Sequence, residues 1–421
     1  MTAERFEATY LIETAHEPAQ IAEVMAGEQS SGTFVAVPGE TEELRALHAG
    51  RVERVTLLDE TPAPSLPGSR PPKGASASPC YRRAEVVISF PALNVGSSLS
   101  QLMTTVAGNL FELAPLSGLR MVDLTLPESF VEDYPGPQFG VEGTRKLTGV
   151  YDRPLFGTII KPSVGLSPAQ TAELVAELVE AGVDFIKDDE LIASPAYSPI
   201  EERVAAVMAV INAHAERTGK KVMYAFNISD DLDRMLRHHD TVLKAGGTCV
   251  MVNLISVGLA GVIQLCRYSQ LPVHGHRNGW GGLSRHPLLG MDYRAFQKFW
   301  RVAGVDHLHV NGLRNKFVES DESVIASARE CLTPLLGGYT VMPVFSSGQT
   351  AAQVPDTYTA LGSKDFLFMA GGGIMAHPGG PAGGVASLRE AWEAAASGIE
   401  LGEYAATHTA LGQALEKFGK A

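Results

Sequence analysis

The most regular feature of the chain is an alternation of short apolar runs with amphipathic stretches, which begins near residue 150. The first amphipathic stretch has the end residues of a helix, with Ser167 as N-cap, Pro168 in the first turn and Gly182 as the stop. Eight strands alternating with about eight helices over roughly 270 residues predict a (β/α)8 TIM barrel. The predicted strands lie at 156–162, 184–190, 222–229, 249–255, 272–278, 306–312, 341–348 and 365–373.

Residues 1–130 follow a different pattern, which predicts a small α+β domain of ferredoxin-like type with an antiparallel sheet. Residues 60–79 are rich in proline, glycine and serine and therefore predict an exposed loop. We accordingly expect two domains, 1–130 and a barrel domain with C-terminal helices over 131–421. The expected strands and helices of the first domain are strands 6–12, 51–58, 83–90 and 119–125 and helices 17–27 and 97–107.

Composition narrows the class of protein. Of the 421 residues, 45% are hydrophobic and the formal net charge is −13, as in an ordinary globular protein. No lysine- and arginine-rich stripe is present, so we expect no nucleic-acid partner. No run approaches the roughly 18 apolar residues of a membrane span, and the N-terminus has no apolar signal region. The four cysteines form no CxxC pair, so we expect reduced thiols in a cytoplasmic protein without a membrane partner.

One segment, DFIKDDEL at 184–191, places a lysine among four carboxylates at the end of an apolar strand. Side chains alternate along a strand, so Lys187 and Asp189 should point the same way and Asp188 the opposite way. Asp189 and Glu190 can then bring two hard oxygens together beside the lysine, which predicts an oxygen-ligand site for Mg²⁺. The alternative is a salt-bridged rim in which the lysine neutralises its neighbours.

Polar residues gather at the C-terminal ends of the predicted strands, where barrel enzymes keep their catalytic groups. Lys161 ends the first strand and is a candidate proton donor or acceptor. His274 and His276 share one strand face, as do His307 and His309, so one of each pair is expected in the barrel mouth. The other reading is that they are core histidines with satisfied hydrogen bonds.

The loops after the last two strands predict a phosphate site. Ser346 and Gly348 end the seventh predicted strand, and Gly371 and Gly372 end the eighth, where a glycine-rich segment begins. Backbone N–H groups without bulky side chains can approach a phosphate closely, and barrels commonly bind phosphate at this position. Arg277 suits bidentate capture of a phosphate or carboxylate. The alternative for the glycines is a flexible turn.

These residues together resemble the RuBisCO large-chain superfamily over nearly the whole chain. The resemblance rests on GTIIKP at 157–162, DFIKDDE at 184–190, HGHR at 274–277, HLH at 307–309, SSG at 346–348 and GGG at 371–373. It implies a homodimer or higher homo-oligomer with active sites at the subunit interface. It also implies that CO2 carbamylates Lys187, which then binds one Mg²⁺ per subunit with Asp189 and Glu190.

The resemblance assigns further roles by position. Glu28, Thr33 and Asn109 match residues that the N-terminal domain supplies to the neighbouring subunit's site, and Lys316 matches the mobile-loop lysine. The expected contacts to phosphate or other substrate oxygens are Arg277, His309, Ser346, Gly348, Gly371 and Gly372. The candidate catalytic residues are Lys161, Lys187, His276, His309 and Lys316.

Several positions depart from the carboxylases of that family. Ser163 replaces a second lysine, Phe34 replaces a tryptophan and Trp280 replaces a histidine. Contacts to a bisphosphate and to added CO2 are therefore lost or changed, and we expect no ribulose-bisphosphate carboxylase activity.

The remaining groups can stabilise an enediolate. HGHRNGWG and HVNGLRNKF are most similar to the RuBisCO-like decarboxylases of branched-sugar catabolism. That similarity implies a lyase that converts 3-oxoisoapionate 4-phosphate to a ketotetrose phosphate and CO2. The alternatives are an enolase or isomerase of a phosphorylated ketose, a transcarboxylase/hydrolase of the same oxo acid, and a non-catalytic sugar-phosphate sensor.

Overall fold

The computed structural model describes residues 4–32, 37–75 and 79–419. The chain forms two compact units. The first contains the residues up to Pro135 together with Gly279–Phe299, and the second contains Gly136–Asn278 and the residues from Trp300 onward.

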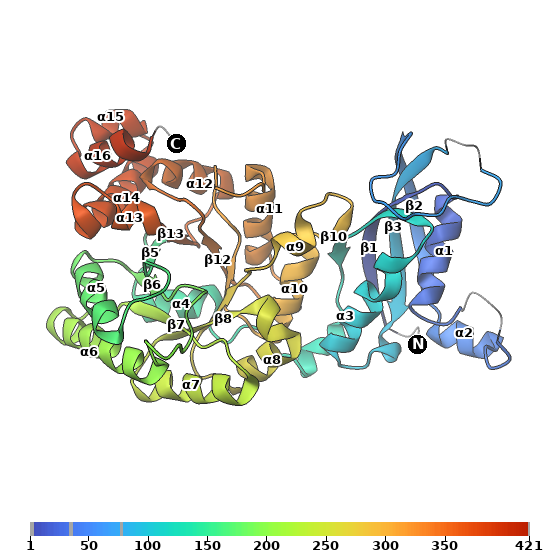
Figure 1. Ribbon diagram of the computed structural model, residues 1–421, viewed down its shortest axis with the longest axis horizontal. Helices are drawn as coiled ribbons and strands as arrows, with labels where there is room; N and C mark the ends of the chain where they lie inside the picture. The colour runs from blue at the N-terminus through green and yellow to red at the C-terminus, as the bar shows by residue number, and fades with distance from the viewer. Residues whose placement is uncertain (1–3, 33–36, 76–78, 420–421) are drawn as a thin grey trace. The chain divides into compact units, whose positions relative to one another are not determined.

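The first unit is built on a five-stranded sheet in the order β10-β4-β1-β3-β2 (Figure 1). Neighbouring strands are antiparallel, except that β10 pairs in parallel with β4. Strand β10 comes from a chain segment that lies in sequence between two barrel strands. The strands are β1 (Arg5–Thr14), β2 (Arg51–Thr61), β3 (Tyr81–Pro91), β4 (Leu116–Leu124) and β10 (Leu289–Met291).

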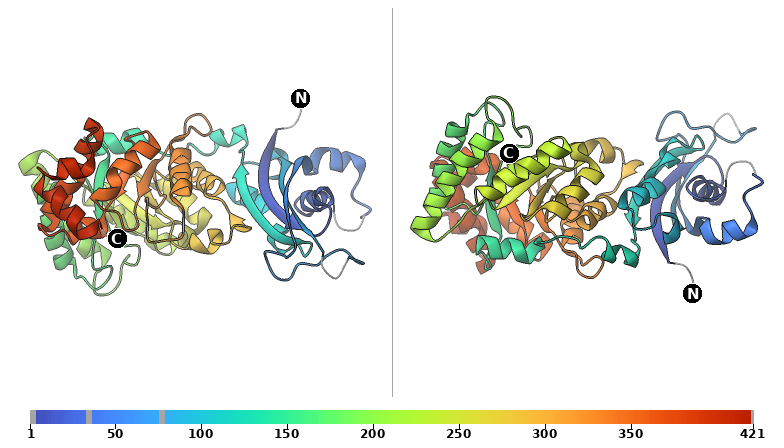
Figure 2. Two further views of the ribbon diagram at one scale, coloured as in Figure 1. Left: turned by 90° about the horizontal axis from the view of Figure 1, so that it is seen from above. Right: turned by 90° about the horizontal axis from the view of Figure 1, so that it is seen from below.

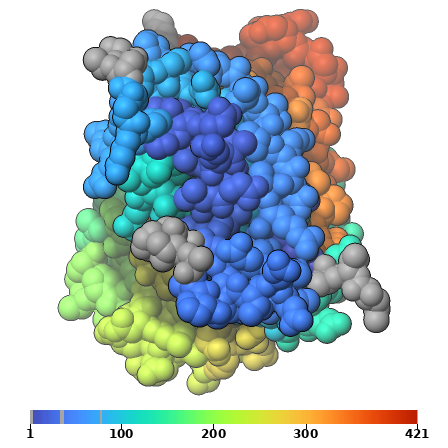
Figure 3. All heavy atoms as spheres, turned by 90° about the vertical axis from the view of Figure 1, so that its right-hand side faces the viewer, coloured from blue at the N-terminus to red at the C-terminus, as the bar shows by residue number. Residues whose placement is uncertain are grey.

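Alternation along β1 explains how this sheet packs. Phe6, Ala8, Tyr10 and Ile12 are fully buried, as expected when every second side chain faces one apolar layer. Helix α1 packs against β1, β2 and β3 and appears in dark blue beside the sheet in Figure 2. Figure 3 shows one face of this unit, with α1 in dark blue and α2 below it in a lighter blue. The helices are α1 (Pro18–Glu28), α2 (Glu42–His48), η1 (Ala92–Asn94), α3 (Leu99–Ala107), η2 (Asn109–Glu112), η3 (Glu128–Glu132) and α9 (Gly281–Ser284).

The second unit is a closed barrel of parallel strands in the order β11-β12-β13-β5-β6-β7-β8-β9. With the small sheet of the first unit, this architecture confirms the predicted fold class. Each strand lies within the run predicted for it or begins one residue earlier. The strands are β5 (Leu155–Ile159), β6 (Phe185–Lys187), β7 (Met223–Asn227), β8 (Cys249–Asn253), β9 (Val273–His276), β11 (His307–His309), β12 (Met342–Phe345) and β13 (Leu367–Met369).

Helices surround the barrel strands (Figure 1). Helix α5 begins as the sequence predicts: Ser167 forms a capping box with Gln170, Pro168 occupies the first turn, and Gly182 has a φ of 82° just beyond the end. The helices are α4 (Gly140–Thr148), α5 (Pro168–Glu180), α6 (Ile200–Thr218), α7 (Leu232–Lys244), α8 (Leu254–Tyr268), α10 (Tyr293–Ala303), α11 (Asp321–Leu332), η4 (Ala351–Gln353), α12 (Val354–Leu361), α13 (Gly371–Met375), α14 (Gly380–Ser397), α15 (Leu401–Ala405) and α16 (Thr409–Phe418).

The inside of the barrel is packed with side chains. Phe185, Met223, Met251 and Leu367 belong to one buried apolar cluster contributed by inward-facing strand positions. Burying a side chain of this size stabilises a fold by roughly 1.5–3 kcal/mol. The cluster closes the barrel interior, so small molecules can reach only its ends. None of the helices in the described part of the chain is both long and apolar enough to cross a membrane.

Candidate active site

Strand β6 sends its consecutive charged residues to opposite sides. Asp188 points into a buried network in which its carboxylate accepts hydrogen bonds from the Tyr224 hydroxyl at 2.6 Å, the Asn227 N–H at 3.0 Å and the Arg203 guanidinium at 3.2 Å. Asp188 is therefore part of the wall that holds β6 against β7 and α6. The Lys187 amine bonds the main-chain oxygen of Asp188 and the Glu190 carboxylate instead, on the opposite side of the strand.

Lys187 is 1% exposed and its amine donates to the Asp188 carbonyl oxygen at 2.9 Å and to Glu190 Oε2 at 3.2 Å. Burial lowers the pKa of Lys187, and the carboxylates of Glu190 and Asp189 oppose that shift. A lowered pKa increases the fraction of neutral amine. The neutral amine is the form that can react with an electrophile such as CO2.

Lys161 stands on the neighbouring strand end, two residues after β5. Its amine lies 2.6 Å from Asp189 Oδ2 and 2.7 Å from the Ser163 hydroxyl oxygen. The Asp189 side chain is 2% exposed and the Lys161 side chain 44%. The end of the barrel thus carries two amine–carboxylate pairs, Lys161 with Asp189 and Lys187 with Glu190.

These residues fit a magnesium site that lacks one anionic ligand. Within residues 4–32, 37–75 and 79–419, no group of three His, Cys, Asp or Glu side chains is arranged to hold a metal ion. Asp189 and Glu190 supply two hard oxygen donors, while Lys187 ends in an amine that is cationic when protonated. A carbamate on Lys187 would turn that position into a third anionic oxygen ligand, which is the donor chemistry Mg²⁺ prefers.

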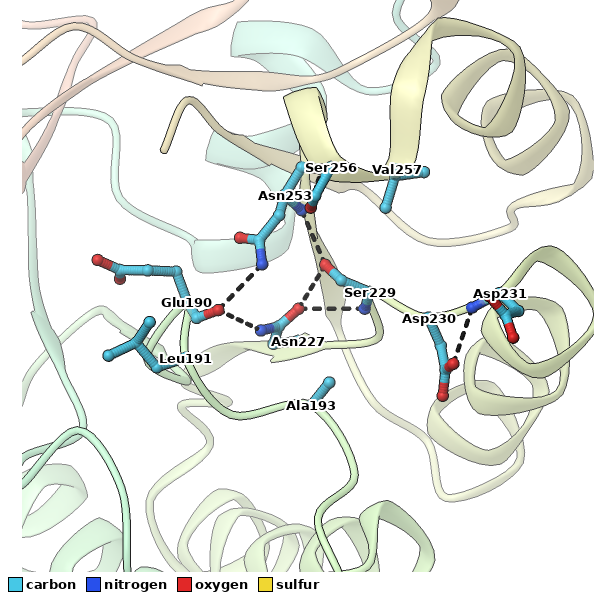
Figure 4. Close-up of a pocket in the computed structure, with 10 residues that line it drawn as sticks. All are labelled: Glu190, Leu191, Ala193, Asn227, Ser229, Asp230, Asp231, Asn253, Ser256 and Val257. Carbon is cyan, nitrogen blue, oxygen red and sulfur yellow. Dashed lines mark hydrogen bonds between the residues drawn. The ribbon is translucent and has the colours of Figure 1, made fainter. Parts of the chain in front are cut away.

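Two asparagines fix the backbone of Glu190. Asn227 donates to the carbonyl oxygens of Asp189 and Glu190 at 3.3 Å, and Asn253 donates to that of Glu190 at 2.9 Å. Figure 4 shows both amides meeting this carbonyl while the Glu190 carboxylate points away from Ser229. They border a pocket of about 370 Å³ whose lining includes Ser229, Asp230 and Ser256. The pocket is polar and adjoins the carboxylate cluster.

All four histidines of the HxH pairs lie inside the barrel. His276 Nε2 is 3.5 Å from Glu190 Oε2, and the His276 and His309 rings are 4.4 Å apart between centroids. Burial lowers the pKa of His276 to about 4, so its imidazole is neutral at pH 7. His274 and His307 are fully buried and hydrogen-bonded, as expected for core histidines. His276 and His309 lie two residues further along β9 and β11, at the C-terminal ends of these strands.

Arg277 is engaged by a carboxylate that the sequence analysis did not single out. Its guanidinium lies 2.5 Å from Glu319 Oε2 and also donates to the Val310 carbonyl oxygen at 3.1 Å. Asn311 donates to the same Glu319 oxygen at 2.6 Å. Glu319 follows Lys316 by three positions in the segment between β11 and α11, and the Lys316 side chain is exposed. No spacing rule connects Glu319 to Arg277, so only the structure reveals this pair.

The remaining predicted phosphate contacts lie at the ends of β12 and β13. Ser346 follows β12 and its hydroxyl is 3.1 Å from His309 Nδ1. Gly348 has a φ of 84°, a conformation that glycine adopts without strain. Gly371 and Gly372 open the short helix α13, and the space around Gly372 is clear to 4 Å from where a Cβ would stand. Gly371 and Gly372 are therefore helical here and do not form a flexible turn.

Two of the three residues predicted to serve a neighbouring subunit lie in the first unit. Glu28 ends α1 and Asn109 begins η2, both exposed and both in the first unit. Their elements adjoin, because the residue after Glu28 packs beside the residue before Asn109: the Gln29 side chain lies next to Gly108. Thr33 lies outside the described residues. Their roles stay predictions.

Comparison with known proteins places this geometry in a family. Residues 140–418 match the ribulose bisphosphate carboxylase large chain, catalytic domain, and residues 77–130 match the N-terminal domain of the same chain. A 3-oxo-isoapionate-4-phosphate transcarboxylase/hydrolase from Xanthobacter autotrophicus is 55% identical over 98% of this chain and 99% of its own. A 3-oxo-isoapionate-4-phosphate decarboxylase from Rhizobium etli is 48% identical over 97% and 98%.

A solved structure agrees with these matches. The crystal structure of a rubisco-like protein from Burkholderia fungorum superposes with a TM-score of 0.92 at 48% identity, covering 99% of this chain and 100% of that one. The N-terminal and catalytic domains of the family match the chain in that order. The chain belongs to the ribulose bisphosphate carboxylase large-chain family.

Proposed function

We propose that the protein is a magnesium-dependent decarboxylase that converts 3-oxo-isoapionate 4-phosphate to a ketotetrose phosphate and CO2. The names of relatives that align over almost the whole chain support this substrate. The observation that carries the proposal is the contact of Lys161 with Asp189 beside Lys187 and Glu190, because it joins a proton donor to a set of metal-binding groups.

Three groups would hold the metal: the carboxylates of Asp189 and Glu190 and a carbamate formed by CO2 on Lys187. Burial favours the neutral Lys187 amine that this modification needs. Bound there, Mg²⁺ supplies several kcal/mol of charge stabilisation to an enediolate. Asn227 and Asn253 hold the Glu190 backbone by donating hydrogen bonds to its carbonyl oxygen.

The chemical step needs one proton donor and no base. In a 3-oxo acid, the bond between the carboxylate carbon and its neighbour breaks, CO2 leaves, and the electron pair passes into the adjacent carbonyl as an enediolate. Lys161 Nζ then donates a proton to the carbon that lost CO2, which completes the ketotetrose phosphate. The Lys161 side chain is partly exposed beyond the end of β5, so its amine is accessible to a bound substrate.

Substrate binding is assigned to the other strand ends. Arg277, Ser346, Gly348, Gly371 and Gly372 would contact the phosphate and the substrate oxygens. His276 and His309 provide uncharged imidazoles between these groups and the carboxylates. The polar pocket beside Asn253 suits the hydroxyl groups of the sugar acid.

The site is proposed to be completed by other segments. Lys316 would close over the bound substrate, and Glu28, Thr33 and Asn109 would come from the second subunit of a homodimer.

A second candidate is transcarboxylation followed by hydrolysis of the same compound. The relative from Xanthobacter autotrophicus that carries this name is 55% identical to the chain. In that reaction the carboxyl carbon moves to another atom of the substrate and stays in an acid product, and water is consumed. The two reactions therefore differ in the fate of one carbon.

Substrate labelled with ¹³C at the carboxyl group separates the candidates. The purified protein is incubated with this substrate, Mg²⁺ and unlabelled bicarbonate in D2O and followed by ¹³C NMR. Label appearing as CO2 and bicarbonate, with one deuterium in the ketotetrose phosphate, supports the decarboxylase. Label retained in an acid product supports the transcarboxylase/hydrolase. Deuterium exchange without loss of label would indicate an enolase or isomerase, and binding without turnover would indicate a sensor.

A further inference from the structure

A continuous line of hydrogen bonds runs through the interior of the barrel, from the end of β12 to helix α4. It connects the residue after β12, Ser346, with residues of β11, β9 and α4: His309, His274, His307 and Thr144. The successive contacts are Ser346 Oγ to His309 Nδ1 at 3.1 Å, His309 Nε2 to His274 Nε2 at 2.8 Å, His274 Nδ1 to His307 Nδ1 at 3.2 Å, and His307 Nε2 to Thr144 Oγ1 at 2.8 Å.

The α4 end of this line has a fixed polarity. Thr144 Oγ1 lies 2.5 Å from the carbonyl oxygen of Gly140. Two oxygens at this distance repel each other unless a proton lies between them, and a carbonyl oxygen can only accept. The single hydroxyl proton of Thr144 is therefore donated to Gly140. The Thr144 oxygen is left to accept, so the proton between it and His307 belongs to His307 Nε2.

Neutral imidazoles pass this polarity along the line. Burial lowers the pKa of His307 to about 3 and holds the pKa values of His274 and His309 well below their usual range. A neutral imidazole carries one proton and one acceptor nitrogen. With its proton on Nε2, His307 accepts at Nδ1, so His274 donates from Nδ1. His274 then accepts at Nε2 from His309, and His309 accepts at Nδ1 from the Ser346 hydroxyl.

We infer that Thr144, His307 and His274 are positioning residues that fix His309 as its Nε2–H tautomer and turn the Ser346 hydroxyl proton away from the barrel mouth. Ser346 then offers only lone pairs to a ligand. It accepts a hydrogen bond from a substrate hydroxyl group and does not donate to a phosphate oxygen. Ser346 is thereby reassigned from a phosphate donor to an acceptor for a substrate hydroxyl group. The identity of that substrate rests on the proposed function, whereas the histidine tautomers do not depend on the proposed function.

The line holds a proton arrangement and does not transport protons. It ends on a peptide carbonyl, which cannot take up a proton from Thr144 at neutral pH. The contacts between the three histidines and Ser346 could be made with every proton reversed. Among the contacts of this line, the Thr144 hydroxyl distinguishes the two directions, so this residue selects the polarity of groups that lie at the other end of the barrel.

Tautomers can be read directly from imidazole ¹⁵N NMR of the full-length protein labelled with ¹⁵N-histidine. The three signals are assigned by substituting His274, His307 and His309 in turn. The expected result is a proton on Nε2 of His307, on Nδ1 of His274 and on Nε2 of His309. A proton on Nε2 of His274, or on Nδ1 of His307 or His309, overturns the inference.

Thr144→Val and Thr144→Ser form a matched pair. T144V removes the oxygen that accepts from His307, so the three tautomers should reverse and the Ser346 proton should face the mouth. T144S keeps the oxygen and should retain the original tautomers. If substrate is turned over, kcat/KM should fall about tenfold in T144V and recover in T144S, as for loss of one hydrogen bond. Unchanged tautomers in T144V would contradict the inference.

The wild-type spectrum alone decides the question if T144V does not fold. The expected tautomers without turnover of any 3-oxo acid phosphate would leave the positioning role standing and refute the proposed function.

Discussion

The amine of Lys161 lies 2.6 Å from Asp189 Oδ2, so the proposed proton donor is paired with a proposed metal ligand. A divalent ion at Asp189 would place two further positive charges beside this ammonium group. Repulsion would then weaken the pair and release Lys161 toward the substrate. Metal binding and liberation of the proton donor are therefore expected to be coupled.

Lys161→Met tests this coupling. The substitution keeps the length of the side chain but removes its charge and its proton. Turnover of 3-oxo-isoapionate 4-phosphate should fall at least about a hundredfold, the usual contribution of a general acid. Mg²⁺ affinity, measured by calorimetry in bicarbonate, should stay equal or increase because Asp189 loses a competing cation.

Lys244→Met is the matched control for that variant. Lys244 is exposed in the last turn of α7, away from the strand ends that carry the cluster. Its turnover and metal affinity should equal those of the wild type. A loss of Mg²⁺ binding in K161M would contradict the competition between Lys161 and the metal.

Asp188→Asn and Asp189→Asn change neighbouring residues in the same way and should have different effects. Asp189 faces Lys161, so D189N should abolish turnover and weaken Mg²⁺ binding while leaving the unfolding midpoint nearly unchanged. Asp188 accepts from Arg203 and Tyr224 in a buried network, so D188N should lower the free energy of unfolding by about 3 kcal/mol. Urea titration and calorimetry give both quantities, and equal effects in the two variants would argue against the opposite orientations.

Glu319→Gln addresses the pairing of Arg277. Glu319 lies 2.5 Å from the guanidinium, so an incoming phosphate must compete with this carboxylate. Removing the negative charge should lower the Kd for inorganic phosphate several-fold and make binding more dependent on salt, because the Arg277 charge is then uncompensated. Glu322→Gln, an exposed substitution in the first turn of α11, should leave the Kd unchanged. An unaltered Kd in E319Q would indicate that Arg277 does not bind the phosphate.

Asp184 precedes β6 and should stabilise the barrel at neutral pH. Burial would raise its pKa, but Arg153 at 2.5 Å and Lys220 at 2.7 Å outweigh it and lower the pKa of Asp184. This stability is present above the unfolded-state pKa of about 4 and is lost as pH falls through the lower folded-state value. D184N should therefore lower the unfolding midpoint in urea at pH 7 and converge with the wild type in acid. Asp365→Asn, at a half-exposed pair with Arg145, should cost less than about 1 kcal/mol.

Asp306 precedes β11, and its pKa is shifted in the opposite direction from that of Asp184. Burial raises its pKa to about 6 although it accepts hydrogen bonds from the N–H groups of Phe139, Gly140 and Val273. A raised folded-state pKa means that its contribution to stability is full below about pH 4 and declines as pH rises to 6. Carboxyl ¹³C NMR should show Asp306 titrating near pH 6, and titration below pH 4 would contradict the effect of burial.

The barrel could be predicted from sequence because each strand is short, apolar and followed by an amphipathic stretch. The run at 184–190 needed only strand alternation to separate Asp188 from Lys187. The prediction of the small sheet was less complete and missed one strand. Leu289–Met291 is too short to show an alternating pattern, and its parallel pairing with β4 is non-local. The turn-like composition of Gly371–Gly373 also concealed a short helix.

The site was predictable only where local spacing carries the chemistry. Lys187 and Glu190 are three positions apart in sequence, so their hydrogen bond could be anticipated. The partner of Arg277 is 42 positions away and the partner of His307 is 163 positions away. Both contacts depend on how the chain closes into a barrel, and Thr144 lies on a helix whose sequence shows no sign of a buried hydrogen bond to a strand.

Strand β10 has a consequence for synthesis of the chain on the ribosome. The antiparallel strands emerge first, but the edge partner of β4 is made only after five of the eight barrel strands. Until then β4 exposes an open row of backbone amides, the kind of edge at which nascent chains adhere to one another. The nascent chain should therefore need chaperone protection most between the synthesis of β4 and the synthesis of Leu289.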